Sequence, residues 1–227
     1  MSVASSPTSL EAADGAVVAR RLTPTRPERA KRATDLVVGG TLFIATLPVV
    51  ATAAAVVALV DRHFPFLGDT RIGRDGRPFN CFKLRSMMKD QSVLDTYFDE
   101  HPDELDAYLE TRKLRFDPRV TGVGRFLRIT SIDELPQLVN VLRGEMSIVG
   151  PRPVSEREFL ARGERRWTIV SARPGITGLW QVKGRSDLPR KTRIALDDLY
   201  ARKRTFWMDA RIMLLTPWAI LSRRGAR

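Results

Sequence analysis

Two adjacent carboxylates, Asp133 and Glu134, stand in the segment Ser131-Ile132-Asp133-Glu134-Leu135-Pro136, at the expected start of a helix. A carboxylate nucleophile beside a second carboxylate that holds a divalent cation is a known arrangement for phosphoryl chemistry through an aspartyl-phosphate intermediate. Because an anionic phosphate repels an anionic nucleophile, Mg²⁺ and arginines must first neutralise the phosphate oxygens. Asp133 and Glu134 are therefore candidate catalytic residues and candidate Mg²⁺ ligands.

A structural role also fits these residues. Ser131 followed three residues later by Glu134 matches a capping box, and carboxylates are favourable at a helix N-terminus. With Ser131 as the cap, however, Pro136 would fall at the fifth helical position, where its missing N–H is already needed. We therefore expect the helix to begin at Asp133 or Glu134. On these residues alone, capping and catalysis both stay open.

Five basic residues could neutralise a phosphate: Lys83, Arg85, Arg128, Arg152 and Arg185. Taken singly, each fits a solvated surface charge. As a group they lie beside glycine and proline turns, rather than along one helix face, and this placement favours binding of an anion.

The charge balance indicates an anionic partner. The 227 residues include 38 Lys and Arg against 26 Asp and Glu, a formal net charge of +12. Nucleic acid, phospholipid headgroups and phosphorylated substrates all fit this charge. One cysteine, Cys81, and two histidines, His63 and His101, exclude an intramolecular disulfide and a cysteine- or histidine-rich metal site. The chemistry must come from carboxylates or hydroxyls.

Residues 36–60 have no ionisable side chain and exceed the roughly 20 residues that cross a bilayer as a helix. Hydropathy alone favours a spanning helix. Two features favour instead a helix that breaks and returns to the same face. Pro48 removes a backbone hydrogen bond near the middle, and the positive-inside bias keeps both basic flanks cytoplasmic. These flanks contain Arg26, Arg29, Lys31 and Arg32 before the run, and Arg62, Arg71, Arg74 and Arg77 after it.

The organisation predicted along the chain is a flexible tail (residues 1–28), a re-entrant membrane helix (29–62) and a catalytic domain (63–227). We expect an α+β fold: a mostly helical cytosolic domain with a small sheet, the membrane helix hairpin and interfacial amphipathic helices. Residues 79–88 suggest a strand, 89–115 an acidic, solvated helix and 135–142 a second helix. Residues 194–221, with Trp207 and Trp218, fit either a helix in the headgroup layer or a core helix.

Short ordered motifs extend from about residue 31 to residue 221. They are Lys31-Arg32 with Asp35, Pro48, Phe82-Lys83-Leu84-Arg85-Ser86-Met87, Asp117-Pro118-Arg119-Val120-Thr121, Ser131-Ile132-Asp133-Glu134-Leu135-Pro136-Gln137, Gly144-Glu145-Met146-Ser147, Gly150-Pro151-Arg152-Pro153, Arg173-Pro174-Gly175-Ile176-Thr177-Gly178, Gln181-Val182 and Gly184-Arg185. Through them the chain resembles the monotopic phosphoglycosyl transferases. These bacterial sugar transferases initiate exopolysaccharide, O-antigen or glycoprotein glycan assembly on a polyprenyl phosphate.

The resemblance implies a role for each matched residue. Asp133 matches the nucleophile that attacks the sugar-linked phosphorus, and Glu134 matches its partner, which helps to organise Mg²⁺. Pro48 matches the break of the re-entrant membrane segment. The basic residues matched around phosphate are Arg85, Arg128 and Arg185, with Lys83 and Arg152 in family motifs. Ser186 departs from the family, because many relatives carry Asn there.

The function implied is transfer of a sugar 1-phosphate from a nucleotide sugar, expected to be UDP-linked, to undecaprenyl phosphate. It would proceed through a covalent aspartyl-phosphosugar with release of UMP. The partners implied are the nucleotide sugar, the polyprenyl phosphate and membrane lipid, and no nucleic acid. The catalytic domain is expected on the cytoplasmic face of the bacterial inner membrane. Contacts with downstream glycosyltransferases and self-association stay open.

Two other classes of protein compete with this interpretation. A membrane-anchored nucleic-acid binder would explain the charge of +12, but it needs cations that track a backbone and aromatic residues for stacking. A scaffold that tethers a glycan-assembly partner would need no reactive Asp133. The identity of the sugar, the nucleotide base and the length of the carrier are not encoded in any motif that we identify.

Overall fold

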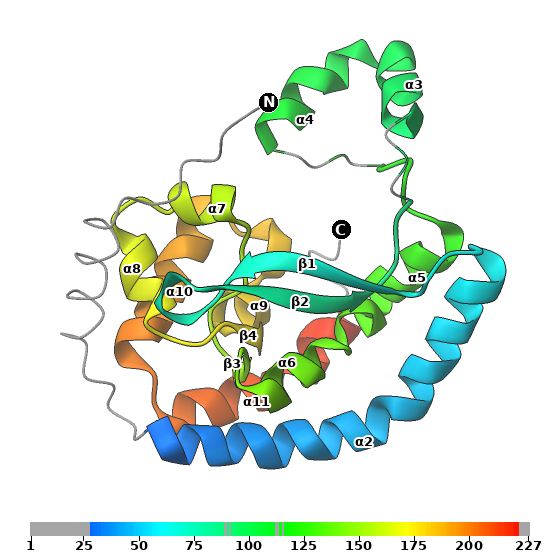
Figure 1. The fold of residues 1–227 in the computed structure, drawn as a ribbon. Coiled ribbons are helices and arrows are strands. Elements are labelled where there is room, and N and C mark those ends of the chain that lie inside the picture. The colour runs from blue at the N-terminus through cyan, green and yellow to red at the C-terminus, as the bar shows by residue number, and fades with distance from the viewer. Residues whose placement is uncertain (1–27, 89, 91, 112–113, 115, 223–227) are drawn as a thin grey trace.

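A computed structural model describes residues 28–88, 90, 92–111, 114 and 116–222. The expected tail, except Glu28, lies outside the described residues. The structure is mostly helical, as predicted, and it has two small sheets where one was expected (Figure 1). Its elements are α2 (Glu28–Val60), β1 (Phe66–Ile72), η1 (Arg74–Gly76), β2 (Pro78–Leu84), α3 (Ser92–Glu100), η2 (Pro102–Glu104), α4 (Leu105–Thr111), α5 (Gly122–Thr130), η3 (Ile132–Glu134), α6 (Gln137–Arg143), β3 (Ser147–Val149), α7 (Glu156–Leu160), α8 (Arg165–Val170), β4 (Gly175–Thr177), α9 (Leu179–Lys183), η4 (Arg185–Asp187), α10 (Arg190–Lys203) and α11 (Phe206–Leu221).

The two sheets carry the residues that converge on the candidate site. β1 and β2 form an antiparallel hairpin in which Asp69 pairs with Cys81 and Leu67 with Lys83. Since alternate residues of a strand share a face, Cys81 and Lys83 lie on one face of this hairpin. β3 and β4 pair in parallel, and β3 leads directly into the segment that contains Arg152.

The main core lies around α6, between the β1–β2 hairpin and α2 (Figure 1). Asn140 of α6 is fully buried and connects this helix to β2. Its side-chain oxygen accepts a hydrogen bond from the Phe82 N–H at 3.0 Å, and its amide nitrogen donates to the Asn80 carbonyl at 2.7 Å. These bonds hold the strand that carries Lys83 against the helix that follows Glu134.

The long apolar segment forms one continuous helix, α2, with Pro48 inside it. The break expected at Pro48 is therefore absent from the hydrogen-bonded helix, although α2 bends near its middle (Figure 1). A bend is what a proline produces when the helix on either side is otherwise intact. The helix is apolar and long enough to cross a membrane, and only 11% of its most apolar 18-residue window is buried.

Both ends of α2 pack on the same globular body. Near its start, buried Lys31 donates to Asp209 of α11 at 2.9 Å. Buried Asp35 accepts hydrogen bonds from Ser147 Oγ at 2.8 Å and from the Ile148 N–H at 3.1 Å. Near its end, Val57 is fully buried against α5 and β2 in a second core cluster. The exposed apolar side chains lie mainly between these two attachments.

The acidic segment (residues 89–115) and the C-terminal segment (residues 194–221) each contain two α-helices where one helix was expected. The acidic segment forms α3 and α4, which project from the body (Figure 1). The single helix expected over residues 194–221 is instead α10 and α11, because Arg204 is extended and the Thr205 side chain caps the new helix at Met208 N–H. In α11, Ile212 is buried in the core as expected of a core helix, whereas Trp207 and Trp218 are exposed; a place for them in the headgroup layer stays a prediction.

Gly124→Ala should strongly destabilise the fold. A Cβ at Gly124 would lie 2.0 Å from the backbone carbonyl oxygen of Ser86, so backbone must move, at a cost of about 3 kcal/mol or more. Thermal unfolding of the purified protein measures the change. Gly122→Ala is the matched control, because its Cβ would meet nothing within 4 Å. Equal unfolding temperatures for the two variants would contradict this close packing of α5.

Candidate active site

The adjacent carboxylates lie in η3, a single turn between α5 and α6. Ser131 ends α5 in the left-handed conformation, with φ of 59°, and its side chain makes no capping hydrogen bond to η3. The capping-box interpretation is therefore wrong. α6 begins at Gln137 rather than at the carboxylates, because Pro136 precedes its first turn. Asp133 and Glu134 consequently lie in a tight turn, free of the role that a helix cap would impose.

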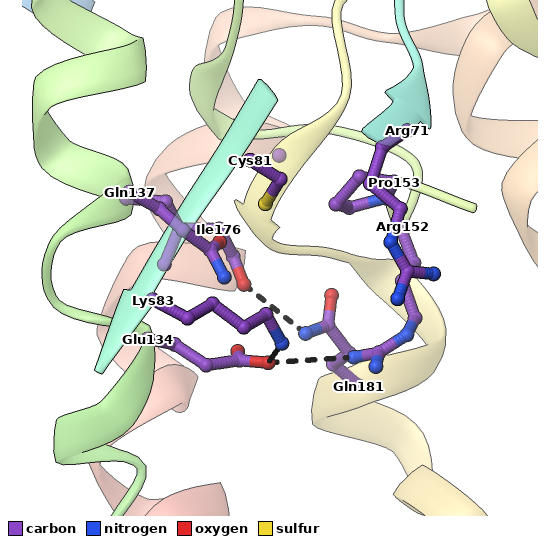
Figure 2. Close-up of a pocket in the computed structure, with 10 residues that line it drawn as sticks. Arg71, Cys81, Lys83, Glu134, Gln137, Arg152, Pro153, Ile176 and Gln181 are labelled. Atoms are coloured by element: carbon purple, nitrogen blue, oxygen red, sulfur yellow. Dashed lines mark hydrogen bonds and ion pairs between the residues drawn. The ribbon is translucent and has the colours of Figure 1, made fainter. Parts of the chain in front are cut away.

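Two of the predicted cations contact Glu134 directly (Figure 2). Lys83 Nζ donates to Glu134 Oε1 at 2.9 Å, and the nearest guanidinium nitrogen of Arg152 lies 3.9 Å from the same oxygen. The fold holds both cationic residues in place, since Lys83 belongs to β2 and Arg152 follows β3. The structure thus brings together three predicted residues that are far apart in the sequence.

The two neighbouring carboxyl groups have different proton affinities. Burial raises the pKa of Asp133 to about 6, and the Glu134 carboxylate adds to this increase against Lys83 and Arg128. Burial also acts to raise the pKa of Glu134, but Lys83, Arg152 and Arg185 outweigh it and lower that pKa to about 2. Near neutral pH, Glu134 is a stable anion, and Asp133 is a more basic carboxylate than an ordinary aspartate. This difference suits Glu134 for cation binding and Asp133 for nucleophilic attack.

Arg128 and Arg185 each bind another side chain and affect the carboxylates through their charge. Arg128 of α5 donates to Ser86 Oγ at 3.0 Å and lowers the pKa of Asp133 by its charge. Arg185 donates to Ser131 Oγ at 3.4 Å and acts on Glu134 in the same way.

No hydrogen bond or ion pair joins Arg85 to either carboxylate within the described residues, and its buried Nε has no hydrogen-bond partner there. A role for Arg85 in phosphate binding stays a prediction. The Ser186 side chain lies outside the described residues.

A small pocket opens beside Glu134, and it includes residues that the sequence did not single out for the site (Figure 2). Its lining comprises Arg71, Cys81, Lys83, Glu134, Gln137, Arg152, Pro153, Gly175, Ile176 and Gln181. Strand alternation from Lys83 could have indicated Cys81, and helical spacing from Glu134 could have indicated Gln137. No local pattern relates Arg71 or Gln181 to the carboxylates, because hairpin pairing and the packing of α9 bring them there.

The oxygen donors fit Mg²⁺ held jointly by protein and substrate. Mg²⁺ is commonly bound by one or two carboxylates together with substrate phosphates and waters. The ionised Glu134 and the adjacent Asp133 supply such a pair, in surroundings rich in cations that suit phosphate. No group of three or more His, Cys, Asp or Glu residues that could hold a metal occurs in the described part of the chain. Substrate oxygens would therefore complete the coordination.

Known proteins are similar to this chain over most of its length. The model of the bacterial sugar transferase family matches residues 26–223. The exopolysaccharide production protein ExoY of Rhizobium meliloti is 41% identical over 198 residues, which are 87% of this chain and 88% of that protein. The undecaprenyl-phosphate galactose phosphotransferase of Salmonella typhimurium is 45% identical over 160 residues, 70% of this chain and 34% of that protein.

A third relative, the UDP-glucose:undecaprenyl-phosphate glucose-1-phosphate transferase of Escherichia coli, is 36% identical over 200 residues, 82% of this chain and 39% of that protein. The match therefore spans most of ExoY but only a third or more of the two larger transferases. The matched range contains the carboxylate pair and the five predicted basic residues. The chain therefore belongs to the bacterial sugar transferase family of enzymes, as its motifs predict.

Proposed function

We propose that this enzyme transfers a sugar 1-phosphate from a UDP-sugar to undecaprenyl phosphate and so initiates an exopolysaccharide or O-antigen-type glycan. The observation that carries the proposal is that buried Asp133 adjoins the half-buried Glu134, which lies beside Lys83 and Arg152. Relatives named as undecaprenyl-phosphate galactose and glucose-1-phosphate transferases support the substrate class. Membership of an enzyme family favours this function over a nucleic-acid binder or a scaffold.

The proposed reaction has two displacements at one phosphorus atom. The Asp133 carboxylate attacks the phosphorus that bears the sugar, the bond from that phosphorus to the bridging oxygen breaks, and UMP leaves with the electron pair. A phosphate oxygen of undecaprenyl phosphate then attacks the same phosphorus and displaces Asp133. The products are undecaprenyl diphosphate sugar and the regenerated carboxylate.

The cationic side chains bind and orient the phosphates during these steps. Lys83 and Arg152 flank Glu134, whereas Arg128 lies on the side of Asp133. Asp133 and Glu134 would hold Mg²⁺, which when bound neutralises phosphate charge and so reduces repulsion of the carboxylate. Lys83 also keeps Glu134 ionised, because its positive charge lowers the pKa of that carboxyl.

The membrane attachment that we propose is a re-entrant α2 with the catalytic domain on the cytoplasmic face. Both ends of α2 pack on one globular body, through Lys31 and Asp35 at the start and Val57 at the end. A body on one side of a bilayer cannot hold the two ends of a straight spanning helix. The exposed Trp207 and Trp218 of α11 would lie in the headgroup layer. The site would then lie close to the lipid phosphate.

Replacing Pro48 by Leu should change this topology. Leucine restores the missing backbone hydrogen bond, so α2 should straighten and one end should cross the bilayer in a measurable fraction of molecules. Reporter cysteines at exposed positions Ala33 and His63, labelled from either side of sealed vesicles, measure this fraction. Ala51→Leu, also exposed, is the control. Labelling of both reporters from the cytoplasmic side alone in Pro48→Leu would show that Pro48 does not decide topology.

Release of UMP tests the function as a whole. The full-length enzyme in membranes that contain undecaprenyl phosphate is incubated with a panel of UDP-sugars. UMP and the sugar-loaded lipid should form in equal amounts from at least one donor, which also identifies the sugar. Release of UDP instead of UMP, or release of neither nucleotide from any donor, would contradict the proposal.

A further inference from the structure

The segment Gly150-Pro151-Arg152-Pro153 carries Arg152 to within 3.9 Å of Glu134, and two residues that contact its backbone, Arg162 and Asp197, do not line the pocket. We propose that the buried ion pair between Arg162 and Asp197 positions Arg152 for phosphate binding by holding its backbone. Arg162 and Asp197 would be positioning residues that touch no substrate. The inference rests on the proposed function of Arg152.

The ion pair lies against the backbone of Arg152. Arg162 donates to Asp197 Oδ2 at 2.9 Å, and the same nitrogen donates to the Arg152 carbonyl at 3.4 Å. The Arg152 backbone N–H also interacts with the Asp197 carboxylate and acts to lower its pKa against the effect of burial. The Arg162 and Asp197 side chains are only 6% and 3% exposed. One closed network therefore joins α10 to the residue that faces Glu134.

The rest of the segment is anchored on either side of Arg152. Gly150 N–H donates to the Thr177 carbonyl at 2.9 Å, and Gly175 N–H donates to the Pro151 carbonyl at 2.8 Å. Beyond Arg152, Ile72 N–H donates to the Val154 carbonyl at 2.9 Å. The ion pair holds the residue between these anchors. Without it, the backbone of Arg152 could rotate although the neighbouring residues stay in place.

Positioning explains this ion pair better than stability does. Burial of two charges costs desolvation that their attraction often does no more than offset, so a buried pair is weak evidence of stabilisation. The Arg152 side chain is 40% exposed and touches Glu134 only at 3.9 Å, so side-chain packing alone does not fix its guanidinium. A misplacement of about 1 Å can cost roughly 100-fold in rate. A fixed backbone limits that error.

A double-mutant cycle tests the inference in the full-length enzyme. The pair variant Arg162→Met/Asp197→Leu, the variant Arg152→Gln and their combination are compared for UMP release at saturating donor. The matched control, Arg202→Gln/Asp198→Asn, removes a neighbouring ion pair of α10 whose arginine is 48% exposed. If the pair variant does not fold, Asp197→Asn, which keeps the side-chain volume, replaces it in the cycle.

The expected result is a loss of kcat of roughly 10- to 100-fold in the pair variant, no further loss when Arg152→Gln is already present, and an unchanged rate in the control. Equal losses in the presence and absence of Arg152 would show a merely structural role and overturn the inference. So would a pair variant with the wild-type rate, or an Arg152→Gln variant as active as the wild type.

Hydrogen exchange of the Arg152 amide gives a readout that does not depend on the reaction. Loss of the ion pair that holds this backbone should accelerate the exchange of the amide about tenfold in the pair variant and leave the control unchanged. Unchanged exchange in the pair variant would also overturn the inference. Failure of the unaltered enzyme to release UMP would refute the proposed function instead, so the two failures are distinguishable.

Discussion

Asp133→Asn should abolish the covalent phosphosugar adduct and reduce turnover by about 10⁴-fold or more, the order of loss seen when an enzyme loses its nucleophile. An amide oxygen is a poor nucleophile, so the first displacement cannot occur. Asn has nearly the size of Asp, and Asp133 is buried in a turn whose backbone bonds it does not supply. The fold should therefore survive, and the loss should be chemical.

Intact mass spectrometry measures the adduct after the enzyme is incubated with UDP-sugar and no acceptor lipid. The unaltered enzyme should gain the mass of one phosphosugar, and Asp133→Asn should gain none. Asp103→Asn is the control, because Asp103 is an exposed acid of η2 far along the chain from the site. An adduct of full yield on Asp133→Asn would mean that another side chain is the nucleophile.

Removal of divalent cations should lower turnover by at least about 100-fold, because the donor phosphates would then repel the attacking carboxylate. Excess chelator followed by UMP assay measures the loss, and added Mg²⁺ should restore the rate. The fold should not depend on the metal, since the described residues contain no cluster of three or more metal-binding side chains. The circular dichroism spectrum should therefore be the same in chelator.

Undiminished turnover in excess chelator would contradict the role assigned to Mg²⁺ and leave charge neutralisation to Lys83, Arg152 and their neighbours. A loss of helical signal in chelator would instead indicate a structural metal. The effect of Asp133→Asn can also be distinguished from the effect of metal removal. Asp133→Asn should stay inactive at any Mg²⁺ concentration, whereas the chelated wild-type enzyme should recover.

The carboxylate pair illustrates what can be read along the chain. Asp133 and Glu134 are adjacent, and the misplaced Pro136 already argued against a simple helix cap. The long apolar segment was equally visible, because membrane length depends only on consecutive residues. The exact form of α2 could not be read from the sequence, since a proline can break a helix or only bend it. The packing of both helix ends decides between these outcomes.

The amino-acid sequence by itself determined the family, the candidate catalytic carboxylates, the surplus of cations and the apolar helix, because each depends on residue type and short spacing. Only the tertiary structure decided which cations reach Glu134. Lys83 is 51 residues away in the chain, and its 2.9 Å contact depends on hairpin register and on Asn140 of α6. Arg71, Gln181 and the Arg162–Asp197 pair join the site or its support for the same reason. Such contacts are set by how distant elements pack, and no local pattern encodes that packing.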